Sequence, residues 1–92
     1  MSGMPDIKIS TLPDLLGVKI KSAAASRKKM GKKIRMLRTA QKITQAQLGF
    51  ESGLSRQGVS LLESGQTNVT FDTLYAIAET LDVPLKDLLD FN

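Results

Sequence analysis

Hydrophobic residues between Thr44 and Gly65 recur at helical spacing in two short runs. The apolar positions that can face one core are Ala46, Leu48, Leu54, Val59 and Leu62. Thr44 and Ser55 are residue types that cap helix starts, because a side-chain hydroxyl accepts a hydrogen bond from a free backbone N–H. Between them, Gly53 suits the left-handed conformation that ends a helix. The pattern predicts two short helices joined by a tight turn.

Three further helices are predicted around this pair. One precedes it over about residues 27–41, one follows over about 70–81 with Thr70 as its cap, and a short last helix runs from Pro84 to about residue 90. The residues expected in the core are Met30, Ile34 and Leu37 of the first, and Phe71, Leu74, Ala78 and Leu81, with Ile77 beside them, of the second.

The pattern before residue 27 is weaker. Residues 7–10 alternate like a very short strand, and residues 13–21 read as a helix. Its apolar stripe is Leu12, Leu16 and Ile20, which we expect to pack on the domain, a second copy or a partner. Residues 22–26 are either a linker or a continuation into the next helix. We therefore divide the chain into an N-terminal extension, 1–26, and a folded domain, 27–92.

The central pair of helices has the spacing of a helix-turn-helix. Its second helix would expose Arg56, Gln57, Ser60 and Leu61. Arg and Gln present paired hydrogen-bonding groups that match guanine and adenine edges in the major groove, so Arg56 and Gln57 are candidates for base contacts. Ser60 and Leu61 are secondary candidates, since a leucine can touch a thymine methyl. An exposed leucine is also common on surfaces that bind nothing.

Residues that match the pattern of a known protein family also lie outside these two helices. They include Ile34 and Arg38, Thr44 and Gln45, and the run G-L-S-R-Q-x-V-S-x-L-E-x-G from Gly53 to Gly65. On these residues the chain resembles, from about Met30 to Leu89, the lambda-repressor-like helix-turn-helix family of Cro and the xenobiotic-response-element proteins. The resemblance implies an all-α, five-helix DNA-binding domain and a transcription regulator of prokaryotic or phage type.

The resemblance also implies roles for individual residues. Arg38 would form a buried salt bridge with Glu63; the alternative is two ordinary surface charges. Gln45 would bind a phosphate, a role that suits a helix N-terminus, where free N–H groups favour negative charge. The other residues expected at phosphates are Lys32, Lys33, Ser55 and Asn68. The last helix would meet a two-fold partner through the apolar residues Leu85, Leu88, Leu89 and Phe91.

Four positions depart from the family pattern. The family usually has alanine at Gly49, serine or threonine at Gly58, and polar residues at Phe50 and Leu61. Glycine inside a helix costs roughly 0.5 to 1 kcal/mol relative to alanine, so both glycines are expected to loosen the motif. Gly58 could instead admit a close backbone approach. Phe50 is either a partner contact or an accident. These departures bear on the target sequence more than on the fold.

Charge divides the chain into two halves. Residues 1–42 hold eleven Lys and Arg against two acids, a net +9, whereas residues 43–92 hold two bases against seven acids, a net −5, so the whole chain carries +4. A basic half suits phosphate neutralisation. Lysines crowd the predicted helix from residue 27, and like charges at that spacing repel, so they make better sense opposite an anion than as a solvated face.

Composition narrows the function classes. The chain has 92 residues, suited to one domain, and it contains no Cys and no His. Disulfides, thiolate chemistry and the favoured ligands of structural zinc are therefore absent, and we predict neither a metal, a cofactor nor an enzyme. No convincing signal peptide and no apolar run near the roughly 20 residues of a membrane span are seen, which favours the cytoplasm.

These observations predict a sequence-specific regulator, in the main a repressor, that binds a palindromic operator on double-stranded DNA as a homodimer. The chain looks similar to antitoxins that repress their own operon, to controller proteins of restriction-modification systems and to small phage repressors. The N-terminal extension favours a protein partner such as a cognate toxin. The rival hypothesis is a protein-interaction module on a helix-turn-helix scaffold, in which DNA binding is secondary.

Overall fold

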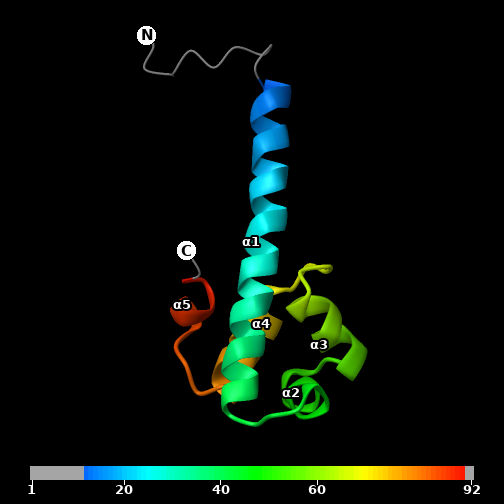
Figure 1. Cartoon of the computed structure of the whole chain (residues 1–92), viewed down its shortest axis with the longest axis vertical. Helices are drawn as coiled ribbons and strands as arrows, with labels where there is room; N and C mark the ends of the chain where they lie inside the picture. The colour runs from blue at the N-terminus through cyan, green and yellow to red at the C-terminus, as the bar shows by residue number, and fades with distance from the viewer. Residues whose placement is uncertain (1–11, 91–92) are drawn as a thin grey trace.

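The computed structural model describes the backbone of residues 12–90 and the side chains of residues 23–90. Its elements are α1 (Leu12–Ala40), α2 (Gln45–Ser52), α3 (Arg56–Glu63), α4 (Phe71–Thr80) and α5 (Leu85–Leu88). Helices α2 to α5 gather around the C-terminal half of α1, which continues past them toward its N-terminus (Figure 1). Residues 12–90 contain no strand, and the fold confirms the predicted all-α, five-helix class.

Helix α1 joins two segments that the sequence treated separately. The predicted helix over 13–21 and the helix predicted from residue 27 are one helix of 29 residues. The connecting residues 22–26 therefore continue the helix, as their three alanines favour, and are not a linker. The predicted strand over 7–10 and the dimer candidate Phe91 lie outside the described residues.

Every helix contributes to one core. Its buried residues are Met30 and Ile34 of α1, Leu48 of α2, Val59 and Leu62 of α3, Leu74, Ile77 and Ala78 of α4, Leu81 and Leu88. Leu37, Ile43, Leu54, Val69, Val83 and Leu85 are partly buried against them. The core is aliphatic, and it positions α3 through contacts with both α1 and α2.

Two residues predicted in the core are exposed. Ala46 stands two positions before the buried Leu48 on α2, and residues i and i+2 of a helix point to different sides. Phe71, the first residue of α4, is 66% exposed and lies 6.2 Å from the ring of Tyr75 one turn on. The buried face of α4 is formed by Leu74, Ile77 and Ala78, so both rings lie off that face.

The predicted helix ends around the turn are present. The Thr44 hydroxyl accepts a hydrogen bond from the Gln47 backbone N–H at 3.0 Å, and the Thr44 backbone N–H donates one to the Gln47 side-chain oxygen Oε1 at 2.8 Å. The Ser55 hydroxyl accepts from the Gly58 N–H at 2.9 Å. Gly53 closes α2 with φ of 76°, a left-handed conformation that glycine adopts without strain. These caps fix where α2 ends and α3 begins.

Gly49 tightens the motif that it was expected to loosen. It is buried in α2, and a Cβ atom there would lie 2.5 Å from the Leu54 carbonyl oxygen. The backbone of the turn packs where a side chain would otherwise be, so only glycine fits this approach. The corresponding prediction is therefore wrong for Gly49. At Gly58 the nearest atom to an added Cβ is the Ser55 hydroxyl oxygen at 3.3 Å, which leaves nearly enough room for alanine.

Candidate nucleic-acid interface

Helix α3 presents a polar outer face and buries the opposite one. Val59 and Leu62 are sealed in the core, while Arg56, Gln57 and Ser60 are exposed. These exposed residues line, together with Gln45 of α2, a shallow hollow of about 330 Å³. Three of the four residues proposed from the sequence to read bases therefore lie together on one surface, beside the start of α2, and the fourth, Leu61, does not line this hollow.

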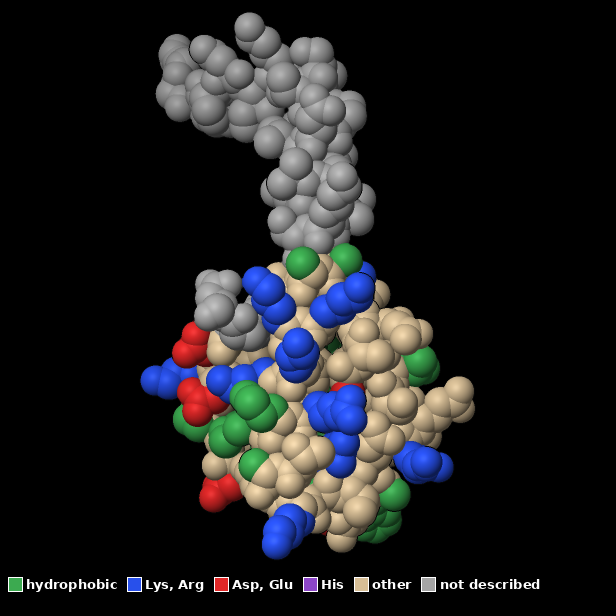
Figure 2. All heavy atoms as spheres, in the orientation of Figure 1, with side chains coloured by type: hydrophobic (Ala, Val, Ile, Leu, Met, Phe, Trp, Pro, Cys, Tyr) green, Lys and Arg blue, Asp and Glu red, His purple; other side chains and the backbone are tan. Residues whose placement is uncertain are grey.

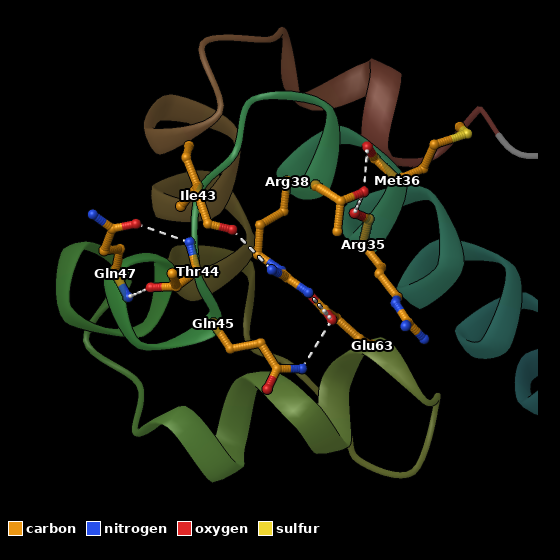
Figure 3. Close-up of polar contacts among 9 residues, drawn as sticks. Arg35, Met36, Arg38, Ile43, Thr44, Gln45, Gln47 and Glu63 are labelled. Atoms are coloured by element: carbon orange, nitrogen blue, oxygen red, sulfur yellow. Dashed lines mark hydrogen bonds and ion pairs between the residues drawn. The ribbon is translucent and has the colours of Figure 1, made fainter.

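A buried ion pair holds α3 against α1. Arg38 Nε lies 2.6 Å from Glu63 Oε2, and Arg38 Nη2 lies 3.0 Å from Glu63 Oε1, which is the paired geometry that suits a guanidinium and a carboxylate (Figure 3). Arg38 Nη1 also donates to the Ile43 carbonyl at 2.8 Å. The two side chains are only 10% and 4% exposed, so the alternative of two surface charges does not apply. The ion pair therefore connects α1 to α3, and the bond to Ile43 connects α1 to the turn before α2.

Gln45 is engaged within the protein. Its side-chain nitrogen donates to Glu63 Oε1 at 3.1 Å, so the amide that was expected at a phosphate joins the buried ion pair (Figure 3). Its backbone N–H is at the first position of α2, where no intrahelical acceptor exists. This backbone group keeps the chemistry needed to bind an anion. The bond to Glu63 could not be predicted from the sequence, since the two residues lie 18 positions apart.

The other residues predicted to bind phosphates lie on different parts of the structure. Lys32 is exposed on α1, whereas the half-buried Lys33 points its ammonium at the Asp90 carbonyl, 3.3 Å away beyond α5. Lys33 therefore lies on a different side of α1 from α3, and its grouping with Lys32 at one phosphate surface is corrected. The Ser55 hydroxyl serves as the cap of α3. Asn68 is exposed in the loop after α3.

Leucines near the chain end have mixed roles. Leu88 is fully buried in the core of the chain, so its prediction as a contact for a second copy is wrong. Leu85 is partly buried against the same core, and Leu89 is 52% exposed. The apolar pattern could not separate these roles, because both core and interface select leucine.

Leu61 and the family departure Phe50 are both exposed. Leu61 is 37% exposed on α3 and borders, with Gly58 and Asn68, a smaller hollow of about 190 Å³. Phe50 is 85% exposed on α2 and stands at a groove of about 650 Å³. The other residues of the groove are Ile43, Ala46, Gln47, Glu51, Glu79 and Thr80.

Neither a candidate metal site nor a membrane-spanning helix is found among the described residues. They contain no group of three or more acidic side chains placed to hold a metal ion. No helix in this part of the chain is long and apolar enough to cross a membrane.

The fold and its exposed polar α3 define a helix-turn-helix DNA-binding regulator. A family model described as helix-turn-helix matches residues 34–88, and the chain belongs to this family. It is 40% identical over 62 residues to control protein C.BamHI of Bacillus amyloliquefaciens, covering 66% of this chain and 76% of that protein. An uncharacterized HTH-type transcriptional regulator, y4dJ of Sinorhizobium fredii, is 38% identical over 63 residues, covering 68% of this chain and 82% of its own length.

Solved structures share the fold. The restriction-modification controller protein C.AhdI from Aeromonas hydrophila superimposes with a TM-score of 0.67 and 39% identity, covering 70% of this chain and 97% of its own. The clp gene regulator ClgR from Corynebacterium glutamicum gives the same TM-score at 27% identity, covering 68% of this chain and 67% of its own. The resemblance stated from the sequence is thereby confirmed at the level of family, fold and regulatory class.

Proposed function

We propose that the chain represses transcription by binding a palindromic operator as a homodimer. The observation that carries this proposal is the grouping of Arg56, Gln57 and Ser60 on one exposed face of a helix whose other face is locked into the core. A rigid scaffold under exposed paired donors is what reading base edges requires. In the dimer, the two copies of α3 would enter successive major grooves roughly 34 Å apart. Bound dimers would then block access of the polymerase.

Different residues would read and hold the DNA. Arg56 and Gln57 would contact base edges, with Ser60 and Leu61 beside them. The backbone N–H at Gln45 and the side chains of Lys32, Ser55 and Asn68 would hold phosphates, which position a protein on the duplex without reading its sequence. Of the residues predicted at the two-fold contact, the exposed Leu89 is the one that we retain.

Similarity to two controller proteins favours one setting for this activity. Both C.BamHI and C.AhdI are named as control or controller proteins, and the match to C.AhdI spans nearly its whole length. We therefore place the chain among regulators of restriction-modification genes ahead of the antitoxin hypothesis. A cognate toxin as partner, a cytoplasmic location and the absence of enzymatic activity remain predictions from the sequence.

The salt dependence of DNA affinity tests the proposal against the interaction-module hypothesis. A dimer that neutralises about six to ten phosphates should lose on the order of a thousandfold or more in affinity between about 50 and 200 mM salt. Fluorescence anisotropy with a labelled duplex measures this loss. If the folded protein has negligible affinity for DNA at the lower salt concentration, the proposal fails. The interaction-module hypothesis would then be favoured.

A further inference from the structure

Four cations form a ledge along one side of α1. Lys28, Lys32 and Arg35 follow one another at spacings of four and three, which places them on one stripe of the helix, and Lys29 adjoins them. We call these four residues the α1 ledge. With Glu63 and Ser64 at the end of α3, they line a hollow of about 310 Å³. Figure 2 shows basic side chains gathered over α1 on the face in view.

The ledge is fixed rigidly beside the end of α3. A Cβ atom at Gly31 would overlap the carbonyl oxygens of Leu62 and Glu63, so α1 and α3 cross there in direct backbone contact. Gly65, just after α3, approaches the backbone and side chain of Lys28 so closely that a Cβ atom would lie 2.7 Å from Lys28 Cα. The position of the cations relative to α3 is therefore set by backbone packing.

The positive charge of the ledge is not compensated nearby. The only carboxylate that lines its hollow, Glu63, is already paired with Arg38. That pair is the single ion pair within the described part of the chain, so none of the ledge cations has a carboxylate partner there. Like charges three and four residues apart destabilise a helix. Four such charges lie together at the edge of the candidate DNA surface. An anion bound there would neutralise them and so stabilise α1.

The ledge continues the surface that α3 presents. Gln57, Ser60 and Ser64 follow one another at spacings of three and four, so the exposed stripe of α3 leads toward the ledge. The hydrogen bond from Gln45 to Glu63 links the two hollows, since Gln45 lines the first and Glu63 the second. A duplex that receives α3 in its major groove would thus have a sugar–phosphate strand beside α1.

We infer that the α1 ledge binds phosphates of the DNA strand bordering the groove, as a second backbone contact separate from the start of α2. The inference rests on the proposed function, because it takes the duplex as the anion. It assigns Lys28, Lys29, Lys32 and Arg35 to this contact and leaves out Lys33, whose ammonium points to the Asp90 carbonyl beyond α5. The contact adds affinity without sequence preference and anchors the C-terminal end of α3 against the backbone.

A charge-matched pair of variants tests the ledge. K29Q/K32Q removes two exposed ledge charges and leaves the packing of Lys28 on Gly65 intact, whereas K33Q/K86Q removes two charges on the α5 side. Affinity for a duplex of mixed sequence is measured against salt for both variants and the wild type. K29Q/K32Q should reduce the slope of log affinity on log salt by roughly 1.8 per protomer, about 0.9 for each lost phosphate contact. The control should keep the wild-type slope.

The outcomes separate the inference from the proposed function. Circular dichroism and thermal unfolding first establish that each variant is folded. If the wild type binds DNA and both variants keep its slope, the ledge is not a phosphate contact, and the inference fails while the proposed function stands. Equal losses in both variants would show an effect of net charge alone and would also overturn it. A wild type that does not bind DNA would remove the proposed function itself.

Discussion

Glu63 accepts hydrogen bonds from Arg38 and from Gln45, and so joins α1, α2 and α3 at one carboxylate. Both of its oxygens are occupied, and its side chain is only 4% exposed. The orientation of α3, the helix that presents Arg56 and Gln57, therefore depends on an ion pair that is buried within the protein. The proposed base contacts of α3 therefore depend on the same ion pair that holds the helix against α1.

Removing one partner of the buried ion pair should destabilise the fold severely. Glu63→Gln leaves the Arg38 guanidinium buried without a counter-charge, which costs about 3 to 5 kcal/mol. That loss is a large part of the roughly 5 to 15 kcal/mol typical of a small domain. Urea unfolding measures it, with Glu79→Gln as the control at an exposed glutamate. The double change R38M/E63L should be milder than E63Q, and a loss under 1 kcal/mol for E63Q would refute the burial argument.

Gly31 and Gly58 should respond in opposite directions to alanine. At Gly31 the new methyl meets the α3 backbone, so Gly31→Ala should cost about 1 to 3 kcal/mol of unfolding free energy through overpacking. Gly58 has nearly enough space, and alanine there should stabilise by about 0.5 to 1 kcal/mol through reduced chain entropy. Chemical denaturation of the two variants in parallel provides the comparison. Equal effects at both positions would mean that α1 and α3 do not cross in backbone contact.

Leu88 and Leu89 should separate folding from assembly. Leu88→Ala opens a cavity in the core and should cost about 2 to 5 kcal/mol. Leu89→Ala, at a half-exposed site, should leave monomer stability nearly unchanged and weaken the homodimer. Unfolding at low protein concentration reports the first effect, and sedimentation equilibrium reports the second. A dimer unaffected by Leu89→Ala would place the two-fold contact on another surface.

Arg56→Ala and Gln57→Ala should abolish sequence preference and keep weak general binding. A good paired contact to a base is worth about 1 to 3 kcal/mol of discrimination, whereas phosphate contacts contribute equally on any sequence. Competition between the preferred duplex and a scrambled one measures the change. Lys86→Ala removes a positive charge on α5 and serves as the control. Wild-type selectivity in both α3 variants would mean that another element reads the bases.

The local parts of the fold could be predicted from the sequence. The two ends of α2 and the start of α3 are predicted from Thr44, Gly53 and Ser55, because helix capping depends on only a few adjacent residues. The pairing of Arg38 with Glu63 came from the family resemblance and is present in the structure. The proposed base-reading role of α3 is inferred from the same helical periodicity that predicts Val59 as buried and Arg56 as exposed, and the structure has Val59 buried and Arg56 exposed.

The long-range parts could not be predicted. Whether Leu88 faces the core or a partner depends on how α5 folds back, which an apolar pattern does not specify. Lys32 and Lys33 are adjacent in sequence, yet one borders α3 and the other α5, because neighbouring residues diverge around a helix. Gly49 was expected to destabilise α2, because the sequence does not show that the Leu54 carbonyl packs against it. Leu54 lies beyond the end of that helix.

Selection of the protein against random duplex DNA at near-physiological salt tests whether α3 reads a DNA sequence. A homodimer that binds through two copies of α3 should enrich a palindrome whose half-sites lie about one helical turn, roughly 34 Å, apart. The enriched sequence would then be sought upstream of the gene for this chain. A folded protein that enriches no sequence would contradict sequence-specific binding, because the exposed face of α3 would then read no bases.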